Sequence, residues 1–209
     1  MQTDLLMPDG PTRAGVLLLH SWWGQTPGYL SFAAALARHG FAVALPDLFD
    51  GRTATTEDEA RALRAAPRRQ PVYRQLEQAL ARLRAEAGGA NSRIGTVGFS
   101  MGGHWAVWLS QRPVYAIRAT VLYYAARGGD FSHCTARTLA HFAETDPFVS
   151  NSARHGMERA MARAGVAYDA FDYPGTGHWF AEPDHPAYRP DAAGLAFERS
   201  QCHLANALL

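Results

Sequence analysis

One serine in this sequence stands in a spacing that suits nucleophilic chemistry. The segment Gly98-Phe99-Ser100-Met101-Gly102 has the pattern G-x-S-x-G, and a strand-like run precedes it while a helix-like run follows it. Such a turn exposes the hydroxyl at a helix N-terminus, where partial positive charge favours a developing anion. We therefore predict that Ser100 is a nucleophile; the alternative is a glycine-rich turn that only allows close packing.

A serine hydroxyl needs a base within hydrogen-bonding reach, and the base needs an acid to orient it. Asp146 follows the expected strand 137–143, and His178 follows the expected strand 166–173 in a glycine-flanked loop. The chain order Ser, Asp, His is the order found with this type of turn. We predict His178 as base and Asp146 as acid, with Glu144 as the rival acid. A capping aspartate and a solvent-exposed histidine are the alternatives.

These residues need a scaffold that brings strand ends together, and the sequence predicts one. Strand-like and helix-like runs alternate, which implies a mostly parallel sheet with helices on both faces. We predict a single-domain α/β-hydrolase fold over residues 1–209 without a separate lid domain, with segment 46–71 bordering the site. The expected strands are 14–20, 41–45, 93–99, 119–124, 137–143 and 166–173, and the expected helices are 29–39, 57–66, 72–87, 101–112, 151–164 and 188–207.

Composition narrows the class of partner. The 209 residues are 47% hydrophobic with a net charge of +1, so no strong field attracts nucleic acid or an anionic membrane. We therefore expect a small, uncharged or weakly charged partner. We also expect a cytoplasmic protein, because no secretory signal is apparent and Cys134 and Cys202 form no disulfide framework. No cofactor or metal is expected, since His133 beside Cys134 lacks zinc spacing. His20 and His104 are expected to be packed or hydrogen-bonded supports.

Four motifs together are similar to the dienelactone hydrolase family over nearly the whole chain. They are His20–Gly24 (HSWWG), Gly98–Gly103 (GFSMGG), Asp146–Val149 (DPFV) and Tyr173–Ala181 (YPGTGHWFA). The resemblance implies an α/β-hydrolase fold with Ser100 as nucleophile, Asp146 as acid and His178 as base. It also implies that the backbone N–H groups of Trp22 and Met101 form the oxyanion hole.

The sequence departs from the family pattern at three positions. The enzymes that name the family use a cysteine where this chain has Ser100, and a glutamate where it has Ser21. They also carry a substrate-binding arginine where this chain has Glu182, four residues after His178, and a carboxylate there would repel a carboxylated lactone. We therefore expect a substrate other than dienelactone itself. The family has a second substrate-binding arginine, and the sequence alone does not show which residue of this chain replaces it. The candidates are Arg61, Arg64, Arg68 and Arg69.

Aromatic residues at strand ends and in loops predict the shape of the substrate pocket. They suit an apolar acyl or alcohol group, although ordinary core packing is the alternative for each. The predicted pocket residues are Ser21, Trp23, Tyr124, Phe148, Trp179 and Phe180, besides Trp22. The resulting hypothesis is a serine esterase or lactonase that works through an acyl-enzyme. A thioesterase or acyltransferase with the same triad, and a non-catalytic binding protein of this fold, are the alternatives.

Overall fold

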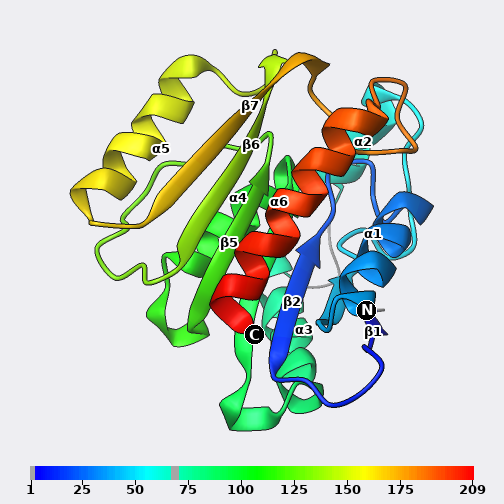
Figure 1. Cartoon of the computed structure of the whole chain (residues 1–209). Helices are drawn as coiled ribbons and strands as arrows, with labels where there is room; N and C mark the ends of the chain where they lie inside the picture. Colours follow the sequence, from blue (N-terminus) through cyan, green and yellow to red (C-terminus); the bar gives the residue numbers. More distant parts are fainter. Residues whose placement is uncertain (1–2, 67–70) are drawn as a thin grey trace.

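A seven-stranded sheet organises the molecule, which is described here by a computed structural model covering residues 3–66 and 71–209 (Figure 1). The strand order is β1-β3-β2-β4-β5-β6-β7, and every neighbouring pair is parallel except β1 with β3. The strands are β1 Thr3–Leu6, β2 Ala14–Leu19, β3 Ala42–Pro46, β4 Arg93–Phe99, β5 Ile117–Tyr123, β6 Arg137–Thr145 and β7 Tyr168–Gly177. Parallel pairing requires a crossover between neighbours, and helices supply these crossovers except between β5 and β6, where residues 124–136 connect the strands without a helix.

Helices cover both faces of the sheet, as a parallel sheet requires. They are α1 Pro27–Arg38, α2 Glu57–Ala65, α3 Val72–Glu86, α4 Met101–Ser110, α5 Asn151–Arg163 and α6 Pro190–Leu208, with short 3-10 turns at Gly89–Asn91 and Pro113–Tyr115. Buried residues of α1 and α6 pack on one face, and those of α3, α4 and α5 pack on the other. Figure 1 shows α1 and α6 together on the near side of the sheet.

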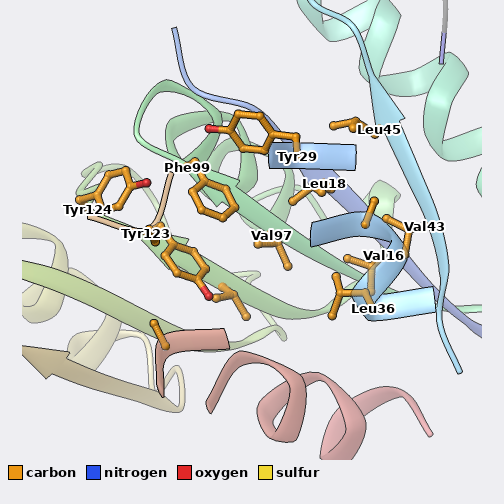
Figure 2. Close-up of a cluster of buried hydrophobic side chains, with 14 of the residues drawn as sticks. Val16, Leu18, Tyr29, Leu36, Val43, Leu45, Val97, Phe99, Tyr123 and Tyr124 are labelled. Atoms are coloured by element: carbon orange, nitrogen blue, oxygen red, sulfur yellow. The ribbon is translucent and has the colours of Figure 1, made fainter. Parts of the chain in front are cut away.

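Alternation along β2 shows how one strand serves two cores. Val16 and Leu18 belong to the cluster under α1 and α6, whereas Leu17 and Leu19 belong to the cluster under α3 and α4. Successive side chains of a strand point to opposite faces, so a continuous apolar run is what a strand covered on both sides needs. Figure 2 shows Val16 and Leu18 in the first cluster, near Leu36 of α1.

The architecture confirms the predicted fold class and most of the predicted elements, with one addition. Strand β1 was not predicted; it has four residues and pairs antiparallel with β3 at the edge of the sheet. Its first residue is Thr3 and its second Asp4, so it lacks a continuous apolar run such as that of β2. Among the helices of the described residues, none has the length and apolar character needed to cross a bilayer.

Candidate active site

Ser100 occupies a strained turn between strand and helix. β4 ends at Phe99 and α4 begins at Met101, so Ser100 alone makes the connection. Its φ is 50°, a left-handed conformation that costs a non-glycine residue about 1–3 kcal/mol. The Ser100 N–H donates to the Tyr123 carbonyl at 2.9 Å, and this bond helps to hold the turn beside β5. The turn presents the serine side chain at the N-terminus of α4.

Two glycines make this turn possible because backbones meet there. A Cβ at Gly98 would lie 2.4 Å from the carbonyl oxygen of Gly102. A Cβ at Gly102 would lie 2.2 Å from the carbonyl oxygen of Leu19, at the end of β2. Neither contact is sterically possible, so the G-x-S-x-G spacing brings the serine close to the segment that follows β2.

His178 joins Ser100 to Asp146 through hydrogen bonds on both ring nitrogens. Its Nε2 lies 2.9 Å from Ser100 Oγ, and its Nδ1 lies 2.7 Å from Asp146 Oδ2. Because a carboxylate only accepts, Nδ1 carries the proton and Nε2 can accept one from the serine. Glu144, the rival acid, is exposed and instead accepts a hydrogen bond from the Gly175 N–H at 2.8 Å. The structure thus brings together the three residues that the sequence singled out.

The segment after β2 is fixed by hydrogen bonds around Trp22. His20 Nε2 accepts from the Leu48 N–H at 3.0 Å, so its Nδ1 carries the proton and donates to the Ser21 carbonyl at 2.6 Å. His20 is therefore a hydrogen-bonded support, as predicted. Within the described residues, the backbone N–H of Trp22 donates to no protein acceptor. The N–H of Met101, the first residue of α4, has no acceptor within its helix.

A pocket of about 390 Å³ opens over Ser100 and His178. Four of the predicted pocket residues line it, namely Trp22, Tyr124, Phe148 and Trp179; the other lining residues are Arg64, Ser100, Met101, His104, Trp105, Arg127, Val149 and His178. The ring of Phe148 lies 4.9 Å from that of His178 and 5.0 Å from that of Trp179. Phe148 is 45% exposed, so an aromatic side chain borders the pocket where it meets solvent.

Three predicted pocket residues lie outside this pocket, two of them fully buried and one in a neighbouring pocket. The Ser21 side chain is fully buried and donates a hydrogen bond to Glu182. Trp23 borders a neighbouring pocket with His185. Phe180 is fully buried against the rings of Tyr124 and Tyr173. Their positions next to motif residues do not place them in the pocket, because neighbouring side chains on an extended or turning backbone point in different directions.

Positive charge, rather than negative, borders the pocket. Arg64 of α2 and Arg127 after β5 both line it, while none of the described lining residues is Asp or Glu. His104 also lines the pocket and is open to solvent, so the prediction that it is a packed support is wrong. Desolvation of the imidazole by neighbouring protein atoms lowers the pKa of His104 most, and the charges of Arg127 and Arg64 lower it further. These effects favour a neutral imidazole beside the two guanidinium groups.

The sequence alone does not show which arginine takes the place of the family's second substrate-binding arginine. The structure distinguishes between the candidates that lie within the described residues. Arg64 reaches the pocket, as the prediction for segment 46–71 implied, whereas the guanidinium of Arg61 lies over the Trp22 ring at 5.8 Å from its centroid. Arg68 and Arg69 fall outside the described residues. Arg127 was not predicted, because a lone arginine after two alanines carries no sequence signal. No group of three or more His, Cys, Asp or Glu side chains is arranged to hold a metal in the described parts of the chain.

Comparisons with known proteins identify the family. The model of the dienelactone hydrolase family matches residues 1–208. The chain belongs to the dienelactone hydrolase family. One relative, a probable 2-oxo-3-(5-oxofuran-2-ylidene)propanoate lactonase from Bradyrhizobium sp., is 27% identical over 82% of this chain and 75% of its own length. A carboxymethylenebutenolidase from Rhodococcus opacus is 27% identical over 82% of this chain and 73% of its own.

Solved structures show the same fold. The crystal structure of a putative dienelactone hydrolase from Klebsiella pneumoniae superposes with a TM-score of 0.77 at 19% identity, covering 94% of this chain and 88% of that one. The protein is thus a dienelactone hydrolase family member with the α/β-hydrolase fold. Its enzyme class is that of hydrolases acting on carboxylic ester bonds.

Glu182 does not face the pocket of this dienelactone hydrolase family member. The expectation that its carboxylate would repel a carboxylated lactone is wrong, because the side chain is 5% exposed and does not line the pocket over Ser100. It turns instead toward Ser21 and Tyr124, whose hydroxyls donate to it at 2.7 and 2.8 Å. Glu182 therefore gives no reason to exclude an anionic substrate.

Proposed function

We propose that the protein is a serine hydrolase that cleaves a small ester or lactone through an acyl-enzyme on Ser100. The observation that carries the proposal is the continuous hydrogen-bonded chain from Ser100 Oγ through His178 to Asp146. Its geometry lets Nε2 take the serine proton while Asp146 stabilises the resulting imidazolium. The strained backbone at Ser100 adds support, since such strain gathers at functional sites.

The first half of the reaction forms the acyl-enzyme. Ser100 Oγ attacks the carbonyl carbon as its proton passes to His178 Nε2, and the C=O electron pair moves onto the carbonyl oxygen. The N–H groups of Trp22 and Met101 donate to this oxyanion, and each such donor is worth about 3 kcal/mol. The C–O bond to the alcohol then breaks, and the departing oxygen takes the proton from His178. In a lactone the alcohol stays attached to the acyl group.

Water completes the cycle. His178 Nε2 takes a proton from the water, whose oxygen attacks the acyl carbon and forms a second oxyanion in the same place. The bond to Ser100 Oγ breaks, and the proton on His178 returns to the serine as the carboxylic acid leaves. Asp146 remains ionised throughout and keeps Nδ1 protonated.

We further propose that the substrate carries an anionic group beside its ester or lactone. Arg64 and Arg127 border the pocket, and the described lining residues include no carboxylate. The name of the Bradyrhizobium relative describes a lactone with a propanoate arm, which is such a substrate. A pocket of about 390 Å³ suits a small molecule of this kind. A cytoplasmic location, suggested by the two free cysteines, is part of the same proposal.

A fluorophosphonate probe tests the serine chemistry, read as the mass of the intact protein. We expect one adduct on the wild type, mapped to Ser100, and none on Ser100→Ala. His178→Ala should react far more slowly because the serine loses its base. Hydrolysis of nitrophenyl esters should disappear in both variants. A well-folded wild type that forms no adduct and hydrolyses no ester would overturn the proposal.

A further inference from the structure

Glu182 is a buried carboxyl group that the proposed reaction does not use. It lies four residues after His178, and hydroxyl groups surround it. Its Oε2 accepts a hydrogen bond from Ser21 Oγ at 2.7 Å, and its Oε1 accepts one from the Tyr124 hydroxyl at 2.8 Å. The Tyr29 hydroxyl also lowers the pKa of this carboxyl group. Figure 2 shows the hydroxyls of Tyr29 and Tyr124 turned toward each other across this part of the core.

The bond to Ser21 fixes the backbone that carries the Trp22 N–H. The Ser21 N–H donates to the Tyr29 hydroxyl at 3.0 Å, and its carbonyl accepts from His20 at 2.6 Å. Its Oγ accepts from the Trp23 N–H at 3.3 Å while donating to Glu182. The residues on both sides of Trp22 are therefore held through Ser21, and the carboxylate fixes the direction of the Ser21 hydroxyl.

The bond to Tyr124 fixes a ring that packs on the base. Tyr124 has φ 37°, and its N–H donates to the His141 carbonyl at 2.7 Å. Its ring centroid lies 4.7 Å from that of His178, and the side chain also lines the pocket. The hydroxyl reaches past His178 to Glu182, which tethers the far end of the ring. The carboxylate thus sets the surface against which the imidazole rests.

We propose that Glu182 is a positioning residue, which through Ser21 holds the Trp22 N–H and through Tyr124 holds His178 in the arrangement that the serine reaction requires. This inference rests on the proposed function above. Glu182 touches neither the substrate pocket nor the reacting atoms, so it acts only through these two neighbours. Burying a carboxylate is costly, and hydroxyl donors on both of its oxygens offset that cost. The same two bonds couple the oxyanion segment to the base.

Three variants and one control test the inference on the full chain. Glu182→Gln, Ser21→Ala and Tyr124→Phe each weaken the network at a different atom. Tyr168→Phe is the matched control, because the Tyr168 hydroxyl also donates to a glutamate, Glu158, at 3.2 Å, but Tyr168 lies at the start of β7 and does not line the pocket. The readouts are the kcat and KM for hydrolysis of nitrophenyl acetate and the midpoint of thermal unfolding.

We expect each network variant to lower kcat by about 10- to 100-fold with KM nearly unchanged, since small misplacements of catalytic groups cost about this much. Tyr168→Phe should lower the unfolding midpoint and keep the wild-type kcat. The double variant Glu182→Gln/Tyr124→Phe should lose little more kcat than the worse single variant, because the two residues act as one unit.

The outcomes separate this inference from the proposed function. Wild-type kcat in Tyr124→Phe and Ser21→Ala would overturn the inference while leaving the serine mechanism intact. An equal loss of kcat in Tyr168→Phe would also overturn it, since the effect would then follow from general destabilisation. If Glu182→Gln fails to fold, the other two variants decide. A wild type that neither hydrolyses the ester nor reacts with fluorophosphonate overturns both.

Discussion

Asp146 accepts a hydrogen bond from His178 Nδ1 at 2.7 Å through one carboxylate oxygen and uses the other for the backbone. Its Oδ1 receives the N–H groups of Phe148 and Val149 at 2.8 and 2.9 Å. Three donors therefore fix one carboxylate, whose side chain is 7% exposed. This arrangement sets both the direction of the imidazole and the nitrogen that carries its proton.

Replacing Asp146 with asparagine tests that relationship. The amide keeps the shape of the side chain but can donate to Nδ1, which shifts the proton to Nε2 and removes the acceptor for Ser100. We expect kcat to fall roughly 10⁴-fold, the scale of this change in other serine triads. Glu144→Gln is the matched control two residues earlier and should keep wild-type kcat in the same ester assay. An equal loss in both variants would contradict the assignment of Asp146.

Gly102 is expected to tolerate no side chain. In Gly102→Ala the new Cβ would meet the carbonyl oxygens of Leu19 and His20 at 2.2 and 2.7 Å, both of them backbone atoms. We expect a loss of about 1–3 kcal/mol in the free energy of unfolding, as for overpacked cores, although alanine favours helices more than glycine. Urea unfolding measures it. Gly128→Ala, where nothing lies within 4 Å of the added Cβ, should unfold like the wild type.

Much of this site follows from local sequence patterns. Ser100, Asp146 and His178 each follow a strand, buried in β4 and β6 and at the sheet's edge in β7, and parallel strands place their carboxyl ends at one edge of the sheet. The turn around Ser100 also carries its own glycine signal. The strand before Ser100 and most of the strand before Asp146 are apolar because helices cover both faces of the sheet there. These features need no knowledge of distant contacts.

Other parts depend on contacts between distant segments, which a single sequence does not show. Glu182 contacts Ser21 across 161 positions of the chain, and a charged residue is rarely this buried, so its sequence position wrongly indicated a pocket residue. Arg127 reaches the pocket because of where β5 ends. Strand β1 depends on pairing with β3, and its own residues give little pattern.

Glu182 should make the stability of the protein depend on pH. Burial raises the pKa of Glu182 to about 7 from the ordinary 4.5, with Asp184 adding to the rise and the hydroxyls of Ser21, Tyr124 and Tyr29 opposing it. A carboxyl group whose pKa is raised in the folded state stabilises that state fully when the pH is below the group's ordinary pKa. This contribution is lost as the pH rises through about 7. The loss amounts to at most about 3 kcal/mol.

The comparison of wild type with Glu182→Gln isolates this effect, since other titrating groups cancel in the difference. Between pH 5 and pH 8, the free energy of unfolding of the variant should rise relative to that of the wild type. Urea unfolding at each pH measures the difference. A difference that stays constant across this range would show that Glu182 does not titrate there, contrary to its burial.

Arg127 and Arg64 should favour anionic substrates over neutral ones. Removing a guanidinium that pairs with a substrate carboxylate costs about 1.5–3 kcal/mol, or roughly a 10- to 100-fold change. We therefore expect Arg127→Ala and Arg64→Ala to raise the KM for the mono-nitrophenyl ester of succinate by about tenfold or more. The KM for nitrophenyl butyrate, a neutral ester of similar size, should change little.

The matched control is Arg163→Ala, which removes an exposed arginine in the last turn of α5, away from the pocket lining. It changes the net charge of the protein by the same amount, so a long-range effect of charge would appear in all three variants. Selective loss in Arg127→Ala and Arg64→Ala would instead place the carboxylate in the pocket. Equal KM changes for the succinate and butyrate esters would contradict an anionic substrate, and the preference would then rest on the aromatic wall of Trp22, Phe148 and Trp179.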